Sequence, residues 1–305
     1  MNSLKIILLL FLPLTLFSQE DYTWWNKKHN WDGITPWDEY IIYSPAYMGP
    51  NALPVPTIKD GRIKDELELE LSLEEHYSKG DNTQNLFSKL YIPLAPKKVA
   101  LELYVVPLEH FKMDSITRDK RRARDYDGEG WVGGDIYFGT IIQIFRDKEK
   151  LPDVTLSLNC KTASGFNLEN ARYTDAPGYF IDLSFGKKLS KEHSFFKHIK
   201  LYGVTGFYSW QTNSDRFPQN DAFLFGMGIN FTNDKLTIDN SLGGYVGFIG
   251  NKDNPLVYRL DLIKKSKTFN YKLGYQLGLN DFEYQTFRFS IIFHIHTDKI
   301  GFLLP

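Results

Sequence analysis

The sequence predicts an all-β fold, a single antiparallel transmembrane β-barrel of about twelve strands preceded by an irregular, aromatic-rich segment. Three observations predict it. The chain begins with an export signal, and residues 66–296 then form a long series of alternating apolar and polar side chains. The connections between the predicted strands also alternate between short and long, as they do in barrels that span a membrane.

The first element is the export signal. Lys5 supplies a positive charge, residues 6–17 are almost purely apolar, and Ser18 and Gln19 end the run. The run is shorter than the roughly 20 residues that a membrane-spanning helix needs. We therefore expect residues 1–19 to be a secretory signal peptide that is cleaved on export.

Residues 20–65 form the second element. Four tryptophans crowd into its first part, and several prolines interrupt its second part, from Pro45 to Pro56. So many prolines exclude a regular strand or helix, whereas the aromatic content argues against disorder. We expect an ordered, irregular segment that packs against or inside the barrel, with entry from the periplasmic side as one possibility.

The barrel is the third element and begins at Glu66. Residues 66–74 alternate between polar and apolar without exception, which is typical of a strand with one face in water or a lumen and the other in lipid. Further strands are predicted at 85–94, 98–112, 134–147, 153–163, 177–188, 197–211, 221–232, 235–249, 255–265, 268–279 and 282–296. Residues 297–305 remain as a C-terminal tail.

Composition agrees with this class. Aromatic residues make up 15% of the chain, and strands and interfacial girdles favour them. A net charge of -1 gives no reason to expect nucleic acid as a partner. The single Cys160 excludes an internal disulfide framework, and the sequence contains no phosphate-binding or dinucleotide-binding motif, so we expect no cofactor and no metal.

In its loop lengths, aromatic lead-in and lysine-rich short turns, the pattern of residues 66–296 resembles Gram-negative outer-membrane β-barrels of about twelve strands, particularly those of Bacteroidetes. The resemblance implies an outer-membrane location, outer-membrane lipid and lipopolysaccharide as surroundings, and possible protein partners in that membrane. One departure is that the last predicted strand is followed by a tail instead of ending the chain.

Alternation also predicts the lumen. If the leucines of residues 67–73 face lipid, the charged residues between them face inward, and both signs of charge occur among the inward positions along the chain. Buried charges must be paired, so we expect a largely self-paired lumen. The expected inward residues are Glu68, Glu70, Glu74, Glu102, Asp135, Asn159, Lys161, Asp182, Asp239, Arg259, Asp261, Lys272, Arg288, Ser290 and His294.

Two groups of side chains are candidates for chemistry. The first is a polar cluster on strand 153–163 and its neighbours, whose members could supply acids, bases or hydrogen bonds for hydrolysis: Asp135, Asn159, Lys161 and Asp182. The second could bind a sugar, a lipid headgroup or a phosphate near the long loops, and comprises Arg172, Asp175, Arg121, Arg122 and Arg124.

Three functions are compatible with this pattern. The first is a structural or binding barrel, or a subunit of an outer-membrane assembly, with no enzymatic activity. The second is a narrow channel for a small polar solute. The third is a hydrolase of outer-membrane lipid or lipopolysaccharide, for which Ser290 and His294 form no suitable pair because positions four apart on a strand lie roughly 13 Å apart.

Overall fold

The computed structural model describes residues 21–148, 150–189, 196–266 and 268–295. The expected signal peptide and C-terminal tail lie outside these ranges. The chain divides into two units, one ending at Thr35 and one beginning at Pro36. Among the described residues, no helix is long and apolar enough to cross a membrane.

The first unit contains helix α2, Thr23–His29, within the segment expected to be irregular. Asn30 ends the helix in the left-handed conformation, and its backbone N–H donates to the carbonyl of Asn26. Asp32 then organises a turn by accepting hydrogen bonds from the backbone of Ile34 and Thr35 at 2.9 and 2.8 Å. The indole of Trp31 closes this turn on the Thr35 carbonyl at 2.7 Å.

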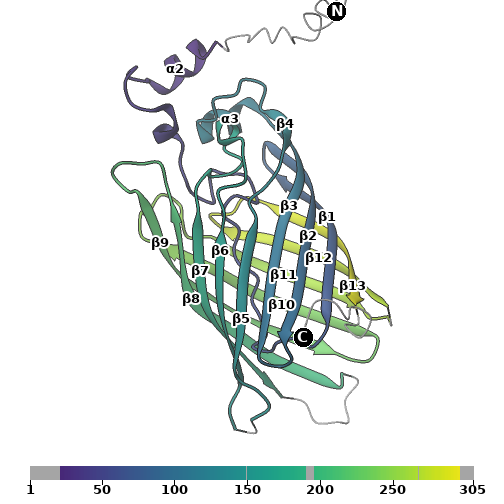
Figure 1. Cartoon of the computed structure of the whole chain (residues 1–305). Coiled ribbons are helices and arrows are strands. Elements are labelled where there is room, and N and C mark those ends of the chain that lie inside the picture. Colours follow the sequence, from purple (N-terminus) through teal and green to yellow (C-terminus); the bar gives the residue numbers. More distant parts are fainter. Residues whose placement is uncertain (1–20, 149, 190–195, 267, 296–305) are drawn as a thin grey trace, which may run out of the picture. The chain divides into compact units, whose positions relative to one another are not determined.

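The second unit is an antiparallel β-barrel (Figure 1). The described residues form thirteen strands in one sheet, and within them β4 pairs only with β3, so twelve strands form the closed ring. The ring strands are β1 Leu67–Ser78, β2 Asp81–Ala95, β3 Val99–Met113, β5 Tyr137–Phe145, β6 Asp153–Lys161, β7 Gly178–Lys188, β8 His198–Gln211, β9 Gln219–Thr232, β10 Leu236–Gly247, β11 Leu256–Lys264, β12 Phe269–Asn280 and β13 Gln285–Ile295. The predicted fold class and number of strands are therefore confirmed.

The barrel closes where the first strand meets the last. Strand β1 pairs with β13 from Leu67 opposite Ile295 to Tyr77 opposite Gln285. Inside this seam the Ser72 hydroxyl donates to Ser290 at 2.7 Å. Closure leaves no open edge in the ring, which is how a sheet satisfies its backbone groups in lipid.

The structure adds three details that alternation did not predict. Strands β1 and β2 extend further than expected and meet in a tight turn at Gly80, whose φ is +89°. The predicted long loop 113–133 contains helix α3, Ser115–Arg121, and strand β4, Glu129–Val132. Helix α3 begins where the Asp114 carboxylate accepts a hydrogen bond from the Thr117 backbone at 2.7 Å.

The two ends of the barrel differ. One end, here called the long-loop end, carries α3, β4 and the connections 162–177, 212–218 and 248–255. The other, the short-turn end, carries connections such as 96–98 and 233–235, and the chain enters β1 there. The longest connections lie at the long-loop end, as predicted, but the tight turn at Gly80 also lies there and the connection 189–197 between β7 and β8 lies at the other end, so the segregation is only partial.

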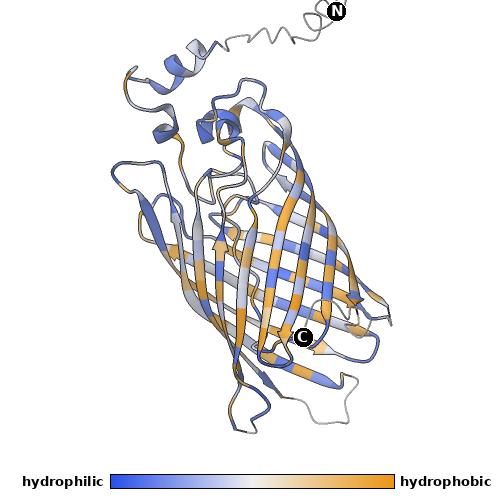
Figure 2. Ribbon diagram, in the orientation of Figure 1, coloured by the Kyte–Doolittle hydropathy of each residue, from blue (hydrophilic) through white to orange (hydrophobic). Residues whose placement is uncertain are grey.

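The outer face of the barrel is apolar. Along the strands the hydropathy alternates, and apolar residues recur across β1, β2 and β3 (Figure 2). Outward leucines and phenylalanines are well exposed, among them Leu73 at 60% and Phe287 at 53%. So many large exposed apolar side chains fit a surface that contacts lipid.

Residues 36–65, here called the lumen segment, run through the barrel and occupy much of its lumen. Apart from the short 3-10 helix η1, Trp37–Tyr40, it has no regular secondary structure. Its apolar residues form the core of the unit with inward aromatic side chains of the wall, including Phe180, Tyr208 and Tyr245. The core residues that the segment supplies are Ile41, Tyr43, Met48, Ala52, Leu53 and Val55.

Candidate functional site: the filled lumen and the charged cluster at its long-loop end

Side chains of the wall hold the backbone of the lumen segment. The prolines of the lumen segment have no backbone N–H, and the buried backbone carbonyls of the segment need hydrogen-bond donors. The Arg259 guanidinium donates to the carbonyls of Val55 and Pro56 at 2.6 and 3.2 Å. The Tyr245 hydroxyl donates to the Leu53 carbonyl at 2.9 Å. The wall thus replaces the hydrogen bonds that a paired strand would have made.

Near the short-turn end the segment touches the wall backbone directly. Gly61 has a φ of +77°, and a Cβ atom there would lie 2.5 Å from the carbonyl oxygen of Asp153. The Gln143 amide donates to the Gly61 carbonyl at 2.8 Å and its oxygen accepts from the Ile63 backbone at 2.9 Å. Only glycine fits this approach without displacing the segment.

Many charges inside the lumen are paired with opposite charges, whereas Arg259 donates to Gln276 and to backbone carbonyls, and Asp239 accepts from Tyr202. Glu102 lies 2.6 Å from the Lys89 ammonium and 3.3 Å from Lys59, which belongs to the lumen segment. Closer to the barrel seam, Lys272 pairs with Glu70, and Arg288 pairs with Glu74. A lumen lined by such pairs has no single dominant sign of charge along its length.

At the long-loop end two arginines enter a buried charged cluster, here called the Arg172 cluster. The Arg172 guanidinium donates to Asp81 at 2.6 Å and to Glu109 at 2.7 and 2.9 Å. Arg121 of helix α3 donates to the same Asp81 carboxylate at 2.6 Å and to the Tyr284 hydroxyl at 2.7 Å. Burial alone would lower the pKa of Arg172, but the two carboxylates raise it well above its ordinary value.

The Arg172 cluster and its neighbours also form hydrogen bonds with the lumen segment. The Asn51 amide donates to Glu109 at 2.8 Å and to Asn85 at 3.0 Å. The backbone N–H of Gly49 donates to the Ala171 carbonyl at 2.8 Å. A Cβ atom at Gly49 would lie 2.7 Å from the Arg172 guanidinium carbon, so glycine lets the two pack face to face.

The predicted catalytic candidates are brought into the lumen wall but do not form one site. Asp135 lies 2.7 Å from the Lys161 ammonium, and both side chains are fully buried. Lys161 also donates to Thr174 at 2.8 Å and to the Ala176 carbonyl at 2.6 Å. Burial raises the pKa of Asp135, while the ion pair acts in the opposite direction.

The other two catalytic candidates lie further down the wall. Asp182 accepts a hydrogen bond from Ser184 at 2.9 Å and lies 3.9 Å from the Lys59 ammonium. Asn159 is buried, and its amide has no hydrogen-bond partner among the described residues. Asp135, Lys161 and Asp182 are thus held in contacts with other side chains, and catalysis by any of the four candidates stays a prediction.

The predicted binding residues separate into two groups. Arg121 and Arg172 are only 2% and 0% exposed, so an anion could reach them only if α3 and the loop after β6 moved. Arg122 donates to the Tyr40 carbonyl at 3.2 Å, and Arg124 lies over the Trp37 ring at 5.1 Å. Asp175 is exposed in the left-handed conformation.

The Arg172 cluster contains Glu109, whose inward orientation the alternating pattern did not predict. Glu109 belongs to a predicted strand, but the inward positions of β3 change from even to odd numbers between Val106 and Glu109. The cause is an irregularity in the pairing of β2 with β3 beside Pro107, which has no N–H to give the ladder. Pro107 was the signal in the sequence from which this change of face could have been inferred.

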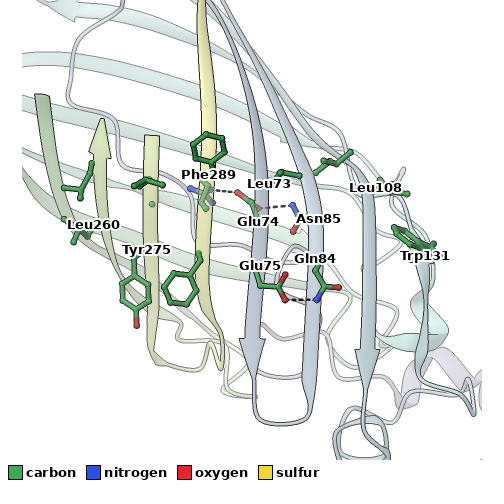
Figure 3. Close-up of a pocket in the computed structure, with 16 residues that line it drawn as sticks. Leu73, Glu74, Glu75, Gln84, Asn85, Leu108, Trp131, Leu260, Tyr275 and Phe289 are labelled. Carbon is green, nitrogen blue, oxygen red and sulfur yellow. Dashed lines mark hydrogen bonds and ion pairs between the residues drawn. The ribbon is translucent and has the colours of Figure 1, made fainter. Parts of the chain in front are cut away.

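Two cavities accompany these elements. Inside the barrel a space of about 180 Å³ is lined by the lumen segment, by aromatic side chains and by charged residues such as Glu102 and Arg259. On the outer face a groove of about 830 Å³ crosses β1, β2 and β11–β13. Figure 3 shows its leucine and aromatic lining, with the Glu75 and Gln84 pair, joined by a hydrogen bond of 2.6 Å, between Tyr275 and Trp131.

Comparison with solved structures shows which known proteins have a similar fold. The chain is similar to the crystal structure of the COG4313 outer membrane channel from Pseudomonas putida F1, with a TM-score of 0.58, 8% sequence identity, and coverage of 79% of this chain and 100% of that one. The fold is that of an outer-membrane β-barrel. This likeness shows the architecture and not the activity.

Further solved structures match less well. The KdgM porin aligns at a TM-score of 0.43 with 9% identity over 74% of this chain and 99% of that one. The NanC porin aligns at 0.46 with 11% identity over 74% of this chain and 100% of that one. No family model and no curated protein matches the chain.

Proposed function

We propose that this protein is an outer-membrane barrel closed to solutes, exported by its signal peptide, that has a structural or binding role. The observation that carries the proposal is the lumen segment. Apolar residues from Ile41 to Val55 pack with inward aromatic side chains of the strands in the core of the barrel, and several of the charges nearby are paired. A diffusion pore would need that space to be filled with water.

Planar-bilayer recording of the refolded full chain tests this proposal. Folding is confirmed first by heat-modifiable gel mobility, and a known porin provides the positive control. We expect folded protein to be electrically silent. Steady conductance with ion selectivity would refute a closed barrel.

A second candidate is a narrow channel that opens when the lumen segment shifts. The internal cavity of about 180 Å³, lined by Lys59, Glu102 and Arg259, favours it because it already offers polar space beside the segment. Arg259→Ala removes the donors to Val55 and Pro56 and should destabilise the closed position. Conductance that appears in this folded variant would favour the channel, whereas continued silence would favour the closed barrel.

Lipids of the outer membrane are the partners that the outer face best supports. The groove across β1 and β11–β13 is lined mainly by leucine and aromatic side chains, among them Leu73 and Phe289. Native mass spectrometry after mild extraction would detect retained lipid. Equal retention by wild type and Phe289→Ser would contradict a role for this groove.

A further inference from the structure

The lumen segment runs the full length of the barrel. At the short-turn end, just before β1, the Lys64 backbone donates to the Tyr91 hydroxyl at 2.9 Å. At the other end, the Asn213 amide, from the connection after β8, donates to Asp38 at 3.2 Å. Figure 1 shows the segment descending inside the barrel from the long-loop end towards the start of β1.

The course of the lumen segment determines at which end of the barrel the residues before Pro36 leave it. Outer-membrane barrels place their short turns in the periplasm and their long loops outside the cell. Strand β1 therefore starts on the periplasmic side, and the chain that precedes Pro36 leaves the barrel on the extracellular side. We propose that the lumen segment is an additional crossing of the outer membrane that displays the mature N-terminal region, including residues 21–35, at the cell surface.

Contacts along the whole segment oppose its withdrawal. At the long-loop end the Ser44 hydroxyl donates to the Lys252 carbonyl at 2.5 Å. Met48 and Leu53, in the middle, are 0% and 1% exposed. Near the short-turn end Arg62 lies 3.0 Å from Asp153. Retraction through the lumen would break all of these contacts and expose the core.

The displayed region has its own ordered structure. Asn30 ends helix α2 with a hydrogen bond to the Asn26 carbonyl, and Trp31 and Asp32 close the turn that follows. On its surface this region presents Ile34, which is 89% exposed, and the cation Lys27. These features suit a small recognition element on the outside of the cell better than a flexible leader.

Cysteine labelling of intact cells tests the proposal with the full chain. The background variant is Cys160→Ser, since Cys160 is the single natural cysteine. Lys27→Cys reports on the N-terminal region, and Thr23→Cys provides a second position if the first variant folds poorly. Asp215→Cys in the 212–218 connection and Lys98→Cys in the 96–98 turn mark the two ends of the barrel, because all of these positions are exposed.

A membrane-impermeant maleimide is added before or after the outer membrane is opened. We expect residues 27 and 215 to react in intact cells and residue 98 to react only after opening. Reaction of residue 27 only after opening, or in neither state while residue 215 reacts, would overturn the proposal. Reaction of residue 98 in intact cells and of residue 215 only after opening would also overturn the proposal, because the short-turn end would then face the outside of the cell. A conducting pore would refute the closed barrel without affecting this labelling result, so the two proposals fail separately.

Discussion

Removal of the Arg172 side chain tests whether the charged cluster holds the long-loop end together. In Arg172→Ala, the buried carboxylates of Asp81 and Glu109 lose their shared donor, and the Thr83 hydroxyl loses its contact at 2.9 Å. Asp81 keeps its ion pair with Arg121, but Glu109 keeps only the neutral donors Asn51 and Tyr173. Deleting one partner of a buried ion pair costs about 3–5 kcal/mol, because the other charge, here that of Glu109, is left uncompensated. The equilibrium constant for unfolding should therefore rise by about two to four orders of magnitude.

Equilibrium urea unfolding in lipid vesicles, followed by tryptophan fluorescence and gel mobility, measures this free energy. Arg122→Ala is the matched control, since Arg122 is exposed and donates to the Tyr40 carbonyl at the longer distance of 3.2 Å, so its loss should cost less than about 1 kcal/mol. Adding Glu109→Gln to Arg172→Ala should recover part of the loss by removing one stranded charge. If Arg172→Ala and Arg122→Ala were equally stable, the cluster would not stabilise the barrel.

Three further changes test the lumen. Gly61→Ala should destabilise the fold by about 1–3 kcal/mol, because its Cβ would meet the Asp153 carbonyl. Gly250→Ala, in the same unit and with similar φ but open space, should cost about 1 kcal/mol, and urea unfolding compares the two variants. Leu53→Ala should cost about 2–5 kcal/mol by leaving a cavity in the core, and an unchanged unfolding midpoint would contradict its burial. Since the pKa of Asp135 is raised in the folded protein, its contribution to stability is present at acid pH and declines as pH rises above its ordinary value. The stability of wild type relative to Asp135→Asn should therefore fall between acid and neutral pH in parallel unfolding titrations, and a constant difference would contradict it.

Strand positions could be predicted from the sequence because alternation is a local property. Whether a residue such as Leu71 faces outward follows from the pleat of its own strand, and the observed exposure of 45% agrees. The pairing of charges in the lumen could also be predicted, because an unpaired buried charge costs free energy. Alternation alone did not predict the orientation of Glu109. An irregularity beside Pro107 shifts the inward positions of β3 from even to odd numbers and so turns Glu109 inward.

The sequence by itself determined the class of fold, the number of strands in the ring and the difference between the two ends of the barrel. Only the tertiary structure decided that the N-terminal segment threads the lumen and that Arg172 joins Asp81 and Glu109. The physical reason is that strand formation depends on neighbours along the chain, whereas the filling of the lumen depends on contacts between residues far apart. Tyr245 reaching Leu53 across 192 positions is one such contact, and no local pattern records it.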